Sequence, residues 1–267
     1  STFTYNKFIK MYTTIQNELA KIEESQEIEI LYACESGSRA WGFPSPDSDY
    51  DVRFIYRHSR EKYLSIHPPE DNINLFITKD LDFNGWEIRK ALLLFGKSNV
   101  SLYEWMQSDT IYQQKTDFIE LLRELAPQYF SPRAAIHHYL GIARNTYEGV
   151  LQEPEVKIKK YFYALRTILS ACWIAHHNEI PPLQFQKLLP LINDSTLMST
   201  VEDLLSQKSQ AKEGETIAHE PYVHQFIETE LKNCQQAVAS FDKKLPNWEP
   251  LNALFREALG YGLEVQN

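Results

Sequence analysis

Two neighbouring stretches of the chain decide its fold: ESGSRAWG at residues 35–42 and SDYDVRF at residues 48–54. The first follows an apolar run, which predicts a strand that ends in a turn at Gly37 and Ser38. The second alternates polar and apolar residues, which predicts another strand. Because strand side chains point to alternate faces, we expect Asp49 and Asp51 on one face and Val52 in a core on the other.

The paired aspartates indicate a site for divalent cations. Two carboxylates side by side repel each other unless a cation lies between them. Mg²⁺ prefers carboxylate, water and phosphate oxygens, and two such ions stabilise both the attacking and the leaving oxygen of a phosphoryl transfer. Gly37 has no Cβ, so a phosphate can approach its backbone, and the Ser38 hydroxyl adds a donor. The two stretches therefore predict two Mg²⁺ ions beneath a bound nucleoside triphosphate.

An apolar residue, Gly-Ser, ten residues and then Asp-x-Asp in an apolar strand form a pattern that resembles the DNA polymerase beta-like nucleotidyltransferase superfamily. The wider string GSRAWGF…DSDYDVR resembles one branch more closely, the bacterial and phage family of predicted nucleotidyltransferases associated with RNA repair. Later segments also resemble that branch: GWEIRKAL at 85–92, KSN at 97–99, EW at 104–105 and KYFYALR at 160–166. The resemblance covers roughly residues 28–175.

The resemblance implies an α+β fold, in which a small nucleotidyltransferase-type α/β catalytic domain with a mixed sheet is followed by an all-helical domain. We expect the catalytic domain at residues 1–120 and the helical domain, which closes the nucleotide cleft, at residues 121–267. The implied activity is transfer of a nucleoside monophosphate from a nucleoside triphosphate to a hydroxyl acceptor, with release of pyrophosphate. An RNA end, a protein and a small molecule are all open as the acceptor.

The resemblance also assigns a catalytic and metal-binding role to three carboxylates. Asp49 and Asp51 would bind both metals, and a third carboxylate would come from the next strand. Asp82, between two apolar neighbours, is the preferred third ligand, and Asp80 is the alternative. Asp82 is also suited to be the N-cap of the helix expected to begin near Gly85.

The nucleotide is expected to contact the helix predicted at residues 156–176. Lys159, Tyr163 and Arg166 are spaced i, i+4 and i+7, so they form one stripe that suits a triphosphate and a base. A solvated helix face is the alternative explanation of this stripe. The expected nucleotide-binding residues are Gly37, Ser38, Arg39, Lys159, Tyr163 and Arg166.

Composition limits the partners and the compartment. The net charge of −9 argues against a long nonspecific nucleic-acid groove. Cys34, Cys172 and Cys234 are odd in number and lack metal-type spacing, so we expect free thiols in a reducing cytoplasm. No apolar run is long enough to span a bilayer and the first residues lack a secretory pattern, so we expect no membrane partner.

Two other functions remain open on these residues. The same scaffold could serve as a non-catalytic nucleotide-binding regulatory module. The basic segment 130–166 could instead make the chain an RNA-binding protein, with salt-sensitive affinity that does not depend on the aspartates.

Hydrophobic periodicity and turn residues predict the remaining elements. We expect strands at 29–35, 50–56 and 72–78, and an exposed loop at 207–219. We expect one helix to begin at Ser131-Pro132 and others at 3–24, 85–96, 101–108, 156–176, 183–192, 196–207, 221–241 and 248–259.

Overall fold

A five-stranded mixed sheet forms the centre of the N-terminal half. The computed structural model describes residues 2–261, with side chains from residue 9 onward. The strands are β1 (Glu29–Ser36), β2 (Tyr50–Arg57), β3 (Asn72–Thr78), β4 (Leu81–Glu87) and β5 (Ile111–Gln114). They lie in the order β3-β4-β2-β1-β5, in which β2 and β4 are parallel and the other pairs antiparallel. The α+β class expected from the sequence is confirmed.

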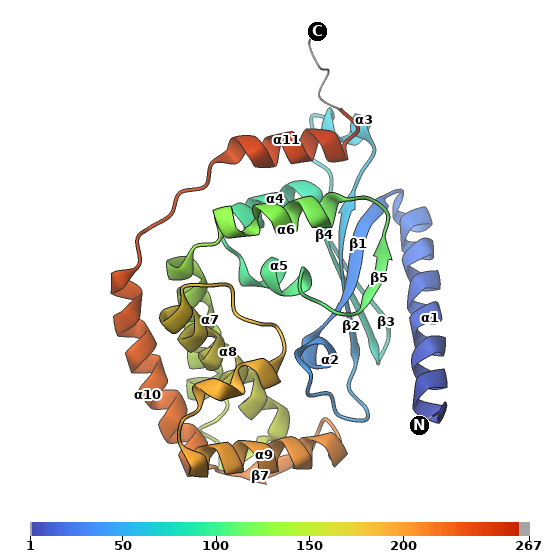
Figure 1. Ribbon diagram of the computed structural model, residues 1–267. Helices are drawn as coiled ribbons and strands as arrows, with labels where there is room; N and C mark the ends of the chain where they lie inside the picture. Colours follow the sequence, from blue (N-terminus) through green and yellow to red (C-terminus); the bar gives the residue numbers. More distant parts are fainter. Residues whose placement is uncertain (1, 262–267) are drawn as a thin grey trace.

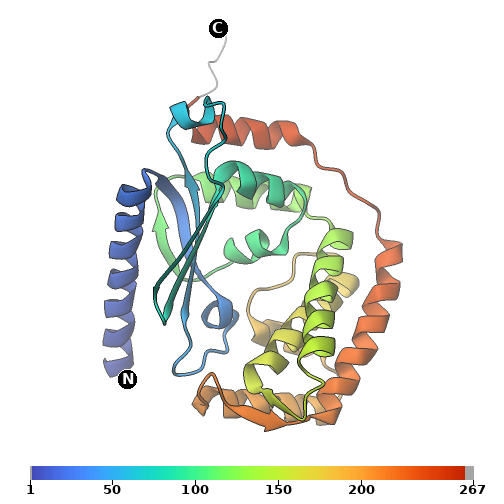
Figure 2. The ribbon, with the colours of Figure 1, turned by 180° about the vertical axis from the view of Figure 1, so that it is seen from behind.

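Helices cover both faces of this sheet (Figures 1 and 2). Helix α1 (Thr2–Gln26) buries Ile15 and Leu19 against the face that carries Val52 and Phe54. The opposite face, which includes Ile55, packs against α4 (Ile88–Gly96), α5 (Val100–Trp105) and α6 (Phe118–Tyr129). The predicted alternation is confirmed for Val52 and Phe54, which lie under α1, whereas Ile55 lies on the opposite face and Asp49 lies just before the strand.

The C-terminal half is mainly helical. It contains α7 (Pro132–Gly149), α8 (Ile158–His177), α9 (Ser195–Gln210) and α10 (Pro221–Ala237). Ser131 caps α7 by accepting a hydrogen bond from the Ala134 N–H, as its sequence predicts. Helix α11 (Trp248–Ala258) returns to pack against α4 and α6. One continuous hydrophobic core joins both halves, and the division at residue 120 stays a prediction.

Several boundaries differ from the sequence-based expectation. Strand β4 continues through Glu87, so α4 begins at Ile88 rather than near Gly85. Gly85 lies so close to the Phe54 ring that a Cβ there would be 2.2 Å from it, which explains a glycine inside this strand. Strand β5 and helix α6 were not predicted. Two short 3₁₀ turns, Phe185–Lys187 and Leu189–Leu191, replace the helix expected at 183–192.

The C-terminal half also differs from an all-helical unit in one place. Strands β6 (Glu155–Lys157) and β7 (Thr216–Ala218) pair as an antiparallel ribbon. The ribbon joins the residues just before α8 to the segment after α9 and holds that segment near the sheet. No helix in residues 2–261 is both long and apolar enough to cross a bilayer.

Candidate active site

Two carboxylates meet at the centre of the sheet because β2 and β4 are parallel and in register. Asp51 lies directly opposite Asp82 in this pairing. The Arg53 Nη2 atom lies 3.0 Å from Asp51 Oδ1 and 2.9 Å from Asp82 Oδ2, so one cationic group bridges both acids. The N-cap of α4 is Glu87, whose side chain accepts from two helix N–H groups, so the N-cap explanation of Asp82 is wrong.

The Gly37 turn lies against the Asp51 carboxylate. Residue Ser36 pairs with Asp51 across β1 and β2. Gly37 has a φ of +62°, and a Cβ there would lie 1.9 Å from Asp51 Oδ2. Only glycine leaves room for this approach and adopts this backbone conformation readily. Gly37 then opens the short helix α2 (Gly37–Trp41).

Burial and neighbouring acidic groups raise the pKa values of Asp51 and Asp49. Burial and the nearby charges of Asp82 and Asp49 raise the pKa of Asp51, although Arg53 opposes them. The pKa of Asp49, which is exposed just before β2, is raised by partial burial and then by Glu213 and Asp80. Each ionised group is therefore unfavourable to its neighbours, as expected where a cation belongs. Asp80 itself is exposed in the turn that precedes β4.

Glu35 is a buried acid that the sequence analysis did not assign. It is only 3% exposed at the end of β1. Its Oε1 atom accepts from the Asp51 N–H at 2.9 Å, and Tyr112 donates to its Oε2 atom. Burial raises the pKa of Glu35 to about 7. An acid at the end of a mainly apolar strand was the only sign in the sequence that Glu35 would be buried.

This burial predicts a pH dependence of stability. Because the folded-state pKa of Glu35 is about 7 against an ordinary 4.5, its contribution is fully present below pH 4.5 and is lost as pH rises through 7. Glu35→Gln should remove up to about 3 kcal/mol of that variation. Urea unfolding at several pH values, without divalent cations, measures it. Glu24→Gln, at an exposed position, is the control, and the same pH profile in both variants would contradict the prediction.

Arg39 fixes the backbone that carries Asp49. Its Nε donates to the Asp49 carbonyl at 3.0 Å and its Nη2 to the Ser48 carbonyl at 2.6 Å. The guanidinium lies 3.9 Å from the centre of the Tyr50 ring. These contacts position the entry to β2, and contact of Arg39 with a nucleotide stays a prediction.

The predicted stripe of Lys159, Tyr163 and Arg166 on α8 is buried to different extents along its length. Lys159 and Tyr163 lie on the side of the carboxylates. Burial raises the pKa of Tyr163. The charge on Lys159 lowers this pKa and the charge on Asp51 raises it. Arg166 is buried deeper, with its Nη1 2.7 Å from Glu104 Oε1 and its guanidinium 3.9 Å from the Trp41 ring centre. The Nε atom of Arg166 is buried and has no hydrogen-bond partner.

Comparison with known proteins gives the family. A family model described as "RNA repair pathway DNA polymerase beta family" matches residues 11–257. The chain belongs to this family. This polymerase beta family member is 47% identical over 228 residues to YcgL, an uncharacterised protein of Bacillus subtilis (strain 168), covering 85% of this chain and 88% of that one. The resemblance recognised in the sequence is thereby confirmed.

A solved structure of low sequence identity also matches the chain. The crystal structure of a nucleotidyltransferase-like protein from Exiguobacterium sibiricum 255-15 is 10% identical to this polymerase beta family member, with a TM-score of 0.28. The match covers 94% of this chain and 79% of that one.

In this polymerase beta family member, the segment after α9 reaches the site. Ser38 Oγ donates to Ser48 Oγ at 3.2 Å, and Ser48 donates to Glu213 Oε1 at 2.6 Å. The other Glu213 oxygen pairs with Lys159 Nζ. Burial alone would raise the pKa of Glu213, but the hydrogen bonds from Lys159 and Ser48 lower it overall. The segment 207–219, expected to be an exposed loop, thus brings an anion to the site.

Proposed function

We propose that this protein is a metal-dependent nucleotidyltransferase that moves a nucleoside monophosphate from a nucleoside triphosphate to a hydroxyl acceptor and releases pyrophosphate. The observation that carries the proposal is the pairing of Asp51 and Asp82 around the Arg53 guanidinium, with Asp51 directly against the Gly37 backbone. An acidic pair beside a glycine turn suits a triphosphate held through metal ions. The family assignment supports this reaction class.

The donor set fits divalent magnesium. The two carboxylates already bind one positive group of the protein, because the Arg53 guanidinium lies between Asp51 and Asp82. Asp49, Asp51 and Asp82 would hold two Mg²⁺ ions, which when bound would stabilise charge on the attacking and leaving oxygens. Asp82 would also accept the proton of the acceptor hydroxyl. Asp80, exposed in the preceding turn, is the alternative for this third position.

The nucleotide would lie between the Gly37 turn and α8. Ser38 would donate to a phosphate oxygen, and Lys159 would supply the positive charge. Lys159 already holds an anion, since it pairs with Glu213, and a triphosphate would take the place of that carboxylate. Tyr163 would lie beside the sugar or base. The unpartnered Nε of Arg166 supports a ligand contact there as well.

Fewer cationic side chains of the segment 130–166 are free to bind RNA than its sequence indicates. Four of its cationic side chains have partners inside the protein. Arg133 donates to the Phe241 carbonyl, and Arg144 donates to Gln235. The other two, Lys159 and Arg166, pair with acidic residues. These contacts favour the nucleotidyltransferase over a plain RNA-binding protein.

The glycine turn gives a specific test of the site. Gly37→Ala should lower transfer at least about tenfold, because the new Cβ would displace the Asp51 carboxylate and because φ is positive at this residue. Gly141→Ala is the matched control, since a Cβ at Gly141 meets no atom within 4 Å. Turnover and unfolding free energy are measured for both variants. Equal turnover in the two variants would contradict the prediction.

The function is tested by incubating the protein and Mg²⁺ with each labelled nucleoside triphosphate, total cellular RNA and total protein. Label in RNA, in protein or in a small product identifies the acceptor, and pyrophosphate release is measured in parallel. An RNA product would agree with the family description. Binding of the triphosphate without pyrophosphate release would favour a regulatory module. Salt-sensitive RNA binding that Asp51→Asn leaves unchanged would favour an RNA-binding protein.

A further inference from the structure

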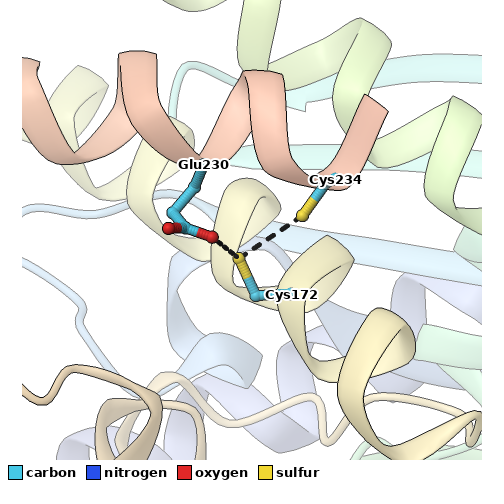
Figure 3. A group of neighbouring side chains, drawn as sticks. All are labelled: Cys172, Glu230 and Cys234. Atoms are coloured by element: carbon cyan, nitrogen blue, oxygen red, sulfur yellow. Dashed lines mark hydrogen bonds between the residues drawn. The ribbon is translucent and has the colours of Figure 1, made fainter. Parts of the chain in front are cut away.

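Two cysteines and a glutamate meet between α8 and α10, outside the carboxylate site. Cys172 comes from α8, whereas Glu230 and Cys234 lie one turn apart on α10. The two Sγ atoms are 3.5 Å apart, and Cys172 Sγ lies 3.2 Å from Glu230 Oε2. Figure 3 shows the three side chains pointing toward one another across the helix interface. The cysteines are only 3% and 2% exposed.

We propose that Cys172, Cys234 and Glu230 form a binding site for a thiophilic divalent cation of the zinc class. Their candidate ligand atoms all lie within 4.8 Å of one another. Two sulfurs bound to one tetrahedral ion at about 2.3 Å are separated by about 3.8 Å. The 3.5 Å between these sulfurs is close to that edge, so the ion requires only a small movement of the thiols.

The ligand types of the cluster agree with a cation of the zinc class. Each thiol would lose its proton to solvent as its sulfur binds the metal, and the resulting thiolates and the Glu230 carboxylate would balance the charge of a dication. Thiolate ligands select zinc over magnesium, so this site and the aspartate site would take different metals.

A neighbouring side chain orients the Glu230 carboxylate. Asn233 Nδ2 donates to Glu230 Oε1 at 2.9 Å, which leaves Oε2 directed at Cys172. Partners of this kind orient metal-binding carboxylates in known sites. Glu230 is only partly buried, so an ion and one water ligand can reach the cluster from its side. A bound ion would fix α10 to α8, the helix that carries Lys159 and Tyr163.

The test uses the full chain, reduced and stripped of metal, and titrates it with Co²⁺. We expect one equivalent of Co²⁺ to give thiolate-to-cobalt charge-transfer absorption and the visible bands of a tetrahedral site. Cys172→Ser and Cys234→Ser should lose these bands. Cys34→Ser, at a buried cysteine outside the cluster, should keep them. Glu230→Gln should weaken binding at least about tenfold, and Asp51→Asn should leave it unchanged.

A second measurement does not depend on cobalt. Zinc at a hundredfold excess over its dissociation constant should raise the Tm of the wild type by about 5 °C or more. It should leave the Tm of Cys172→Ser unchanged. Absence of the thiolate bands in the reduced wild type, or their persistence in both cysteine variants, overturns the proposal. So does a Cys172–Cys234 disulfide in the protein as isolated, seen as one free thiol instead of three. None of these outcomes depends on nucleotidyl transfer.

Discussion

Asp51→Asn is expected to lower nucleotidyl transfer by about a thousandfold or more. Asparagine keeps the shape of the side chain and removes the charge that faces Gly37, Asp82 and Asp49. Its stability should change little, because burial and neighbouring acids already disfavour the ionised form of Asp51 in the fold. Pyrophosphate release in the presence of Mg²⁺ and excess triphosphate measures the loss. Unfolding in urea shows whether the variant is still folded.

A matched pair of variants decides the third carboxylate. Asp82→Asn should be nearly as damaging as Asp51→Asn, because the two residues lie opposite each other and share Arg53. Asp80→Asn removes the same charge from an exposed turn and should keep transfer within a few fold of the wild type. If Asp80→Asn lowers nucleotidyl transfer as much as Asp82→Asn does, the role of third carboxylate belongs to Asp80.

The acidic centre was predictable because its signals are local. Gly37 directly follows β1, Asp49 directly precedes β2 and Asp51 lies in β2, so all three are close together in the sequence. The alternation of a strand then fixes which side chains share a face. To place Asp82 beside Asp51, the position of β4 must be known, and the sequence does not show this strand clearly. The run 85–92 resembles a helix, but the helical period of buried residues begins only at Ile88. Gly85 and Trp86 belong to β4 instead.

Contacts between distant segments could not be predicted from one sequence. Ser48 and Glu213 are separated by 165 positions, and Glu213 lies in a polar stretch that is typical of an exposed loop. Cys172 and Cys234 are 62 positions apart and meet only because α8 packs on α10. The sequence placed Arg166 on the same stripe as Lys159. A helical period shows which residues share a face but not how deeply that face is buried. In the fold, Arg166 is buried beside Glu104 of α5.

Arg166→Met is expected to lower the free energy of unfolding by about 3–5 kcal/mol. The variant leaves Glu104, which is only 8% exposed, buried without its cation. Glu104 also accepts from Tyr139 at 2.9 Å, so it cannot turn to solvent without breaking that bond. Arg256→Met is the control, because its partner Glu249 is exposed and an exposed pair contributes less than about 1 kcal/mol. Urea unfolding compares the two variants.

Adding Glu104→Gln to Arg166→Met separates a structural role of Arg166 from contact with the nucleotide. The double variant carries neither charge, and the amide oxygen of the substituted side chain would still accept from Tyr139, so we expect it to regain more than half of the lost stability. If Arg166 contacts the triphosphate through its unpartnered Nε, nucleotide affinity should stay at least about tenfold below the wild type in the restabilised protein. Affinity that returns together with stability would mean that Arg166 only supports the stripe above it, and that Lys159 and Tyr163 bind the nucleotide alone.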